Sequence, residues 1–250
     1  MNVSLYQAAA ALNANSQWQD VISSNLASSS IPGFKKQELS LAAVKAGLMP
    51  SSGLTSSNLP QSFMVPKAAM STSFLAGEMQ PTGNKNDVAI EGKGFFSVEL
   101  PNGSTVFTRD GQFQVNAKGQ LVTPEGYAVL GESGPISVSL NNPAPMTISA
   151  NGVVSQGAEQ KGKLKVTEFN KPELLTQISG AYFVANNPTL VSQSSTSTLR
   201  QGYLEGSNTS VVGEMANMIT AMRSFEANQH IIQIQDDRLG KTISDLGNPT

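Results

Sequence analysis

Apolar positions near the N-terminus recur at alternating steps of three and four residues, the spacing of one face of a coiled-coil helix. The face consists of Leu5, Ala8, Leu12, Asn15, Gln19, Ile22 and Leu26. Four alanines at positions 8–11 favour a helix and leave a thin side that another helix can approach closely. Since proline disfavours helical geometry in the residue before it, the helix is predicted to end before Pro32-Gly33.

The C-terminal end repeats this alternation over a longer stretch. Its face consists of Met215, Met218, Met222, Phe225, Gln229, Ile232, Asp236, Leu239, Ile243 and Leu246. Thr209 or Ser210 can cap the start of this helix, and Gly247-Asn248-Pro249 can end it. Both predicted faces contain polar residues, which weaken a coiled coil but select register and partner. Each helix alone is compatible with an ordinary core helix, but two such faces favour pairing with each other and with neighbouring copies.

Between the two predicted helices the pattern changes to short strands separated by turns. Residues 47–86 are rich in Ser, Pro, Gly and Met and predict an extended connector with one strand near residues 62–65. From Asp87 onwards, β-branched and aromatic runs alternate with turn signals such as Asn102-Gly103 and Asp110-Gly111. A spacing of ~8–12 residues between turns is typical of β-sandwiches and barrels.

These patterns predict an α+β fold. Long N- and C-terminal helices would form a coiled-coil layer, and an all-β domain, sandwich-like or barrel-like, would be inserted between them. The expected boundaries are residues 1–30 for the first helix, 31–86 for the connector, 87–205 for the β domain and 206–250 for the second helix.

Composition excludes several classes of protein. Only 14% of the 250 residues are charged and the net charge is −2, which argues against a nucleic-acid binder because such proteins need a basic patch. Without cysteine the chain has no disulfide, no thiol nucleophile and no cysteine-based metal site. The N-terminus lacks the pattern of a cleaved signal peptide, and we expect no membrane insertion because no run approaches ~18 apolar residues.

Candidate catalytic groups are few and poorly placed. The single histidine, His230, lies in the middle of the predicted C-terminal helix, and Pro135 breaks the nucleophile-elbow pattern that begins at Gly131. Gly92-Lys93-Gly94 lacks the rest of a phosphate-binding loop. A hydrolase would need a pair of carboxylates, for which Glu91, Asp110 and Glu132 are the candidates, although each lies in or beside a turn. We therefore expect no enzymatic activity, no cofactor, no metal site and no small-molecule substrate.

Three motifs carry a resemblance to a known family. They are Ser24-Asn25-Leu26-Ala27 with Ile31-Pro32-Gly33-Phe34-Lys35, then the stretch from Asp87 through Phe107-Thr108-Arg109-Asp110-Gly111 to Thr123, and finally Gly202-Tyr203-Leu204-Glu205-Gly206-Ser207-Asn208 with Arg223-Ser224-Phe225-Glu226. In this order they resemble the motifs of bacterial flagellar rod, hook and hook-associated proteins. Asn25, Pro32, Gly33 and Phe34 match the turn that follows the family's first helix.

The resemblance implies a structural subunit of the flagellar basal-body rod. Such a subunit would leave the cell through the flagellar type III export apparatus without a cleaved signal peptide. It would then assemble helically in the periplasm with other copies of itself and with neighbouring rod proteins, and transmit torque. Within the family, chain length, residues 129–136 and chiefly the short connector between Phe34 and Asp87 favour a proximal rod protein, and a distal rod protein is the alternative.

Two functions of other classes remain open from the residues alone. A secreted binding module would recognise a carbohydrate or peptide through Tyr127, Phe107 or the face formed by Lys161, Lys163 and Lys165. A carboxylate-dependent hydrolase would depend on Glu91 and Asp110. Aromatic residues in strands more often fill a core, and alternating lysines more often lie on the exposed face of a strand, so the structural function is preferred.

Overall fold

The computed structural model describes residues 3–49, 61–187 and 196–247, and it divides the chain into two compact units. Unit 1 consists of Met1–Leu26, Gln37–Ser71 and Ser210–Thr250. Unit 2 consists of Ala27–Lys36 and Thr72–Thr209. The chain therefore passes from one unit to the other four times.

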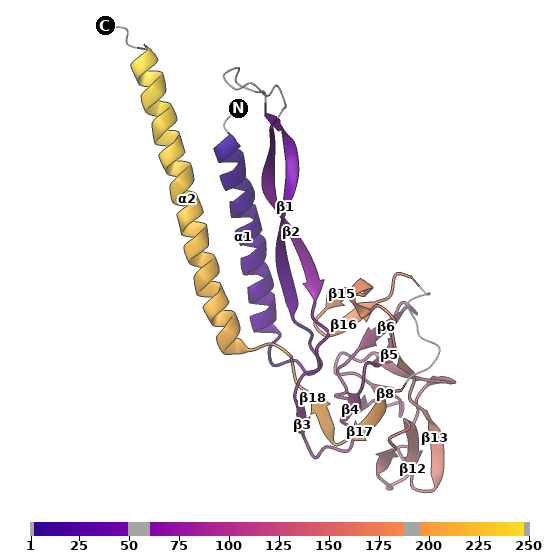
Figure 1. Ribbon diagram of the computed structural model, residues 1–250. Coiled ribbons are helices and arrows are strands. Elements are labelled where there is room, and N and C mark those ends of the chain that lie inside the picture. Colours follow the sequence, from indigo (N-terminus) through magenta and orange to yellow (C-terminus); the bar gives the residue numbers. More distant parts are fainter. Residues whose placement is uncertain (1–2, 50–60, 188–195, 248–250) are drawn as a thin grey trace. The chain divides into compact units, whose positions relative to one another are not determined.

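Two long helices belong to unit 1 (Figure 1). Helix α1 (Val3–Ala27) has 25 residues and α2 (Val211–Gly247) has 37, which correspond to lengths of ~38 and ~56 Å. The first helix ends before Pro32-Gly33, as predicted. Ser210 caps the second helix, because its Oγ accepts a hydrogen bond from Gly213 N at 3.3 Å.

Two long strands, β1 (Gln37–Met49) and β2 (Gln61–Thr72), also belong to unit 1 and pair with each other (Figure 1). Ser40 Oγ donates to Ala69 O at 3.2 Å, whereas the side chain of Gln7 on α1 donates to Met64 O of β2 at 3.1 Å. Here the sequence predicts a connector with a single strand. The apolar alternation is too weak to indicate a sheet, because the described side chains of β1 and β2 are largely exposed on both faces. Residues 50–60 of the predicted connector lie outside the described residues.

The main sheet of unit 2 has the strand order β15-β16-β6-β5-β9-β8-β7, with β10 paired to β9 and β14 paired to β5. Its central strands are β5 (Phe95–Glu99) and β6 (Thr105–Thr108), joined at the predicted Asn102-Gly103 hairpin, where Gly103 has a φ of 80°. The other strands are β7 (Gln114–Val115), β8 (Leu121–Val122), β9 (Ala128–Gly131), β10 (Gly134–Pro135), β14 (Val166–Thr167), β15 (Thr176–Ser179) and β16 (Tyr182–Val184). A 3-10 turn, η1 (Pro172–Leu174), precedes β15.

Smaller sheets complete unit 2. Strands β11 (Met146–Ile148), β12 (Val153–Gln156) and β13 (Glu159–Lys163) form a three-stranded sheet. The last two strands, β17 (Thr198–Gln201) and β18 (Tyr203–Glu205), pair with β4 (Val88–Glu91) and β3 (Met79–Pro81). The end of the unit thus pairs with strands that precede the main sheet in the chain.

Two apolar clusters fill unit 2. The larger cluster joins inward-facing residues of the main sheet and the smaller sheets, including Phe96, Phe113 and Leu121. The smaller is aromatic and contains Phe95, Phe107, Phe169 and Phe183, with Phe95 and Phe169 packed edge to face at 5.5 Å. Two terminal helices thus flank a β-rich region, and the chain has the α+β composition expected from its sequence.

Candidate functional site

A buried ion network in unit 2 joins the three sequence motifs. Lys35 follows α1, Arg109 follows β6, and Glu205 ends β18. Glu205 Oε1 lies 2.5 Å from Lys35 Nζ, and Glu205 Oε2 lies 3.0 Å from Arg109 Nη1. The side chains of Lys35 and Glu205 are 0% and 2% exposed. Charges this deeply buried are tolerated only when they are paired and hydrogen-bonded.

Further hydrogen bonds use most of the remaining polar atoms of the network, whereas the buried Nε of Arg109 has no hydrogen-bond partner among the described residues. Lys35 Nζ donates to Leu75 O at 2.8 Å, Arg109 Nη2 donates to Gly92 O at 2.8 Å, and Glu205 Oε1 accepts from Gly77 N at 2.8 Å. The guanidinium of Arg109 also lies over the ring of Phe95, 4.9 Å from its centroid. The network therefore ties five segments of unit 2 together.

The charges of the network depend on one another. Burial by itself would raise the pKa of Glu205, but the attraction of Arg109 and Lys35 outweighs it and holds the pKa below its ordinary value. Burial lowers the pKa of Lys35, although Glu205 opposes this effect. Glu205 is the only anion of the three, so both partners favour its charged form, whereas Arg109 disfavours the charged form of Lys35.

The predicted family turn is packed into this network. Gly33 has a φ of 68° and is hydrogen-bonded through its N–H to Glu205 O at 2.7 Å. A Cβ at this position would lie 2.3 Å from the carbonyl carbon of Arg109, so only glycine allows the two backbones to approach. Phe34 is 1% exposed, and Pro32 is half-buried. The turn therefore has an anchoring role within unit 2.

Asn25 lies at the end of α1 and is also buried. Its Nδ2 donates to Gln37 O at 2.8 Å, and its Oδ1 accepts from Gln37 N at 2.9 Å. One side chain thus pairs with both backbone groups of the first residue of β1. This pairing fastens the end of α1 to the start of β1 within unit 1.

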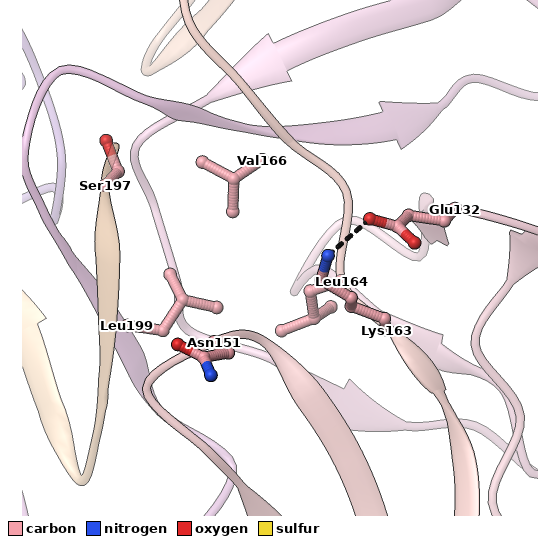
Figure 2. Close-up of a pocket in the computed structure, with 7 residues that line it drawn as sticks. All are labelled: Glu132, Asn151, Lys163, Leu164, Val166, Ser197 and Leu199. Atoms are coloured by element: carbon pink, nitrogen blue, oxygen red, sulfur yellow. Dashed lines mark hydrogen bonds and ion pairs between the residues drawn. The ribbon is translucent and has the colours of Figure 1, made fainter. Parts of the chain in front are cut away.

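A hollow in unit 2 contains polar groups but not the arrangement that nucleophilic catalysis needs. It measures about 320 Å³ and is lined by Glu132, Asn151, Lys163, Leu164, Val166, Ser197 and Leu199. Figure 2 shows the ion pair between Lys163 and Glu132, with an N–O distance of 2.7 Å, across the hollow from Ser197. Ser197 Oγ donates to Glu168 Oε1 at 2.7 Å and accepts from Gly94 N at 2.9 Å. A serine held this way, with no histidine in the lining, is not an activated nucleophile.

The candidate catalytic residues from the sequence have other environments. His230 is exposed on α2, and Glu91 is exposed at the end of β4. Asp110 is buried, and burial raises its pKa to about 6, with a smaller contribution from Glu125 and an opposing hydrogen bond from Gln112 N. Among the described residues no three His, Cys, Asp or Glu side chains gather into a group that could hold a metal ion.

The residues of the hypothetical binding face also have internal partners. Phe107 belongs to the buried aromatic cluster, and the ring of Tyr127 packs edge to face against Tyr182 at 5.5 Å. Lys161 forms an ion pair with Glu159, as Lys163 does with Glu132. Nothing in this arrangement singles out a carbohydrate or peptide site.

The predicted face of α1 lies against the rest of the chain. Ala8, Asn15 and Ile22 are buried, and Leu12, Gln19 and Leu26 are half-buried. The side chain of Leu5 lies outside the described ones. A second row, which the sequence analysis did not include, is also buried or half-buried and contains Ala11, Ala14, Trp18 and Val21. In the sequence, the run of alanines at positions 8–11 indicated that this side of the helix could be approached closely.

The predicted face of α2 is divided between two environments. Met218, Phe225 and Ile232 are half-buried, whereas the remaining described members are exposed: Met215, Met222, Gln229, Asp236, Leu239 and Ile243. The side chain of Leu246 lies outside the described ones. The row that is buried or half-buried follows the same alternation but is rotated by one residue, and it consists of Glu214, Met218, Ala221, Phe225, Asn228, Ile232 and Gln235. Three of these seven, Glu214, Asn228 and Gln235, are polar, so hydrophobicity alone did not indicate the row.

A second apolar row on α2 is exposed. It consists of Val212, Met215, Ile219 and Met222, which are 79%, 54%, 54% and 54% exposed. Their steps of three, four and three residues place them on one side of the helix. We call these four residues the exposed row of α2. None of the described helices is both long and apolar enough to cross a membrane.

Comparisons with known proteins agree with the three motifs. Residues 5–35 match the family model described as flagella basal body rod protein, residues 89–156 match the flagellar hook protein FlgE/F/G D1 domain, and residues 200–245 match the flagellar basal body rod FlgEFG protein C-terminal model. The chain is 34% identical to the flagellar basal-body rod protein FlgG of Buchnera aphidicola subsp. Schizaphis graminum, over 95% of this chain and 97% of the relative. It is 32% identical to FlgF of Escherichia coli, over 96% and 97%.

A third relative, FlgG of Borreliella burgdorferi, is 32% identical over 94% of this chain and 96% of its own length. The chain therefore belongs to the family of flagellar basal-body rod proteins. These proteins are structural subunits of the rod and not enzymes.

Proposed function

We propose that this chain is a proximal rod subunit of the FlgF type, which assembles helically with copies of itself and with neighbouring rod proteins through its terminal helices. In this proposal it is exported by the flagellar type III apparatus without a cleaved signal peptide, and it transmits torque across the periplasm. FlgG, a distal rod protein, is the alternative. Identities of 34% to one FlgG and 32% to one FlgF do not separate the two, so the preference depends on the short connector between Phe34 and Asp87, on chain length and on residues 129–136.

The exposed row of α2 is the observation that carries the proposal. Four large apolar side chains on one side of a helix gain free energy when another surface removes them from water, at about 25 cal/mol per Å² of apolar area. For half-exposed side chains this amounts to about 1 kcal/mol each. Summed over many contacts in a helical assembly, such increments favour the assembled state over the free subunit.

The strands β1 and β2 support the same proposal. Leu41, Val44, Met64 and Met70 are large apolar residues that are 40–58% exposed. A two-stranded ribbon of this kind is marginally stable by itself and is stabilised by further packing. Neighbouring subunits would supply that packing.

A paired arrangement of α1 and α2 is the second part of the proposal. Each helix has a row of buried or half-buried residues in three-four alternation, which is the spacing of a coiled-coil contact. Asn15 on α1 and Asn228 on α2 would then be the polar residues that select register. For the β-rich unit 2 we retain the hypothesis of a sandwich-like or barrel-like arrangement, since two apolar clusters lie among its sheets.

The experiment that tests the proposal introduces a charge into the exposed row. Because Met222 is 54% exposed, Met222→Asp should leave the thermal unfolding of the free subunit unchanged while it blocks assembly and motility. Ile232→Asp, on the half-buried row, should impair both folding and assembly. Thr220→Asp is the matched control, since Thr220 is exposed on α2 outside both rows and should assemble as wild type. Normal assembly of Met222→Asp would refute the role of the exposed row.

A further inference from the structure

Asn208 is the last residue of the first part of the third motif, Gly202–Asn208. It lies where three segments of unit 2 are about to leave that unit. Lys36 precedes the first residue of β1, Ser73 follows the last residue of β2, and Asn208 itself lies three residues before α2. Nothing in the ion network requires an asparagine here. The position is therefore the part of the motif that the network leaves unexplained.

One side-chain amide connects the three segments. Asn208 Oδ1 accepts from Lys36 N at 2.7 Å, while Asn208 Nδ2 donates to Ser73 O at 2.8 Å and to Leu75 O at 3.1 Å. The amide group has only two N–H donors, and both are used. Its orientation is determined by its neighbours, because carbonyl oxygens require the nitrogen and a backbone N–H requires the oxygen.

Backbone contacts bring the same segments close together. Asn208 N donates to Phe34 O at 3.4 Å, Ser73 N donates to Lys36 O at 2.9 Å, and Gly206 N donates to Glu78 O at 2.8 Å. A Cβ on Gly77 would lie 1.9 Å from Gly206 O, so the two backbones touch directly. Residues 205–208 therefore run between residues 33–36 and residues 73–78, and the Asn208 amide joins all three.

We propose that Asn208 is a positioning residue that holds the start of β1, the end of β2 and the approach to α2 in one arrangement, and that assembly through α2 depends on it. This inference rests on the proposed function. The physical reason is that assembly must present α2 and the β1–β2 ribbon to neighbouring subunits together. If the segments that lead to β1, β2 and α2 changed conformation independently, ordering them would cost conformational entropy at each assembly step.

Three full-length variants test the role of Asn208. Asn208→Ala removes all three side-chain hydrogen bonds. Asn208→Asp keeps the acceptor for Lys36 N but faces two carbonyl oxygens with a carboxylate. The matched control is Asn116→Ala, because Asn116 is similarly half-buried in unit 2 and also makes three side-chain hydrogen bonds, with Lys118 N, Gln120 N and Gln120 Oε1.

The expected result separates positioning from general stability. Asn208→Ala and Asn116→Ala should lower the melting temperature by similar amounts. Only Asn208→Ala should raise amide hydrogen exchange in the peptides that contain Lys36 and Ser73, and slow seeded polymerisation, each by about tenfold. Asn116→Ala should polymerise at the wild-type rate. Polymerisation of Asn208→Ala at the rate of Asn116→Ala would overturn the proposal.

Two further outcomes are decisive. If Asn208→Ala does not fold, Asn208→Asp decides: a folded protein that polymerises slowly supports the positioning role, and one that polymerises normally, or that also fails to fold, refutes it. The proposed function is judged separately by Met222→Asp. If Met222→Asp fails to assemble while a folded Asn208 variant assembles normally, only the positioning role of Asn208 is refuted. If Met222→Asp assembles normally, the proposed role of the exposed row of α2 is refuted.

Discussion

Replacing Glu205 with glutamine is the most informative perturbation of unit 2. The substitution keeps the size of the side chain and removes its charge, so Lys35 and Arg109 would remain buried without a counter-ion. Leaving a buried charge uncompensated costs about 3–5 kcal/mol of unfolding free energy. For a domain of this size, each kcal/mol lowers the melting temperature by about 2–4 °C, so the expected loss is roughly 6–20 °C.

The assay must report on unit 2, and the single tryptophan does not, because Trp18 lies on α1. Differential scanning calorimetry, or hydrogen exchange of peptides from β5 and β6, meets this need. Glu132→Gln is the matched control, since Glu132 pairs with Lys163 at 2.7 Å but the two side chains are 57% and 42% exposed. Exposed pairs contribute ~0–1 kcal/mol, so this variant should unfold within a few degrees of wild type.

A double variant identifies the cause. Lys35→Met/Glu205→Gln removes one of the two stranded charges and should recover part of the stability lost in Glu205→Gln, giving a coupling free energy of about 1–3 kcal/mol. Equal losses of stability in Glu205→Gln and Glu132→Gln would show that the network contributes no more than a surface ion pair.

The same network predicts that unit 2 is sensitive to acid. Because the pKa of Glu205 is lowered on folding, its contribution is complete above the unfolded pKa of ~4.3 and is lost as pH falls through the folded value.

Three further variants test individual features. Burial raises the pKa of Asp110 to about 6, so the folded state binds more protons than the unfolded chain between pH ~4 and ~6, and stability falls as pH rises through that window. In urea titrations, Asp110→Asn should remove ~2–3 kcal/mol of this pH dependence. An unchanged pH profile of stability would contradict the prediction. Gly33→Ala should destabilise unit 2 by more than ~1 kcal/mol in calorimetry, because its Cβ would meet the Arg109 backbone at φ 68°, and a wild-type melting temperature would exclude that contact. Ser210→Ala should reduce α2 stability by ~1 kcal/mol, seen as faster exchange in its first turn, whereas Ser210→Asp should retain the cap.

Local features could be predicted from the sequence with good accuracy. The Asn102-Gly103 turn, the Ser210 cap and the end of α1 before Pro32 all depend on residues a few positions apart. Their conformations follow from backbone preferences and from hydrogen bonds between residues that are close together in the sequence. The strands β4, β5 and β6 were predictable for a similar reason, because each is a short run of β-branched and aromatic residues bounded by turn signals.

The β1–β2 ribbon was predictable only in part. Its residues lack a regular apolar alternation, since the described side chains of both strands are mostly exposed. Backbone hydrogen bonds pair the two strands. When neither face of a sheet is buried, the pattern of apolar side chains carries little information about this pairing. The half-buried row of α2 was missed for a related reason: Glu214, Asn228 and Gln235 are polar, and only their place in the folded chain buries them.

From its sequence alone this chain is a two-helix protein with an inserted β region, no enzymatic machinery and the motifs of a rod subunit. Only the tertiary structure decided that Lys35 and Glu205, which are 170 residues apart, are buried against each other with Arg109. In the sequence each is simply a charged residue, which most often lies in water. Whether such a charge is buried and paired depends on which distant segments the folded backbone brings together, and no local preference contains that information.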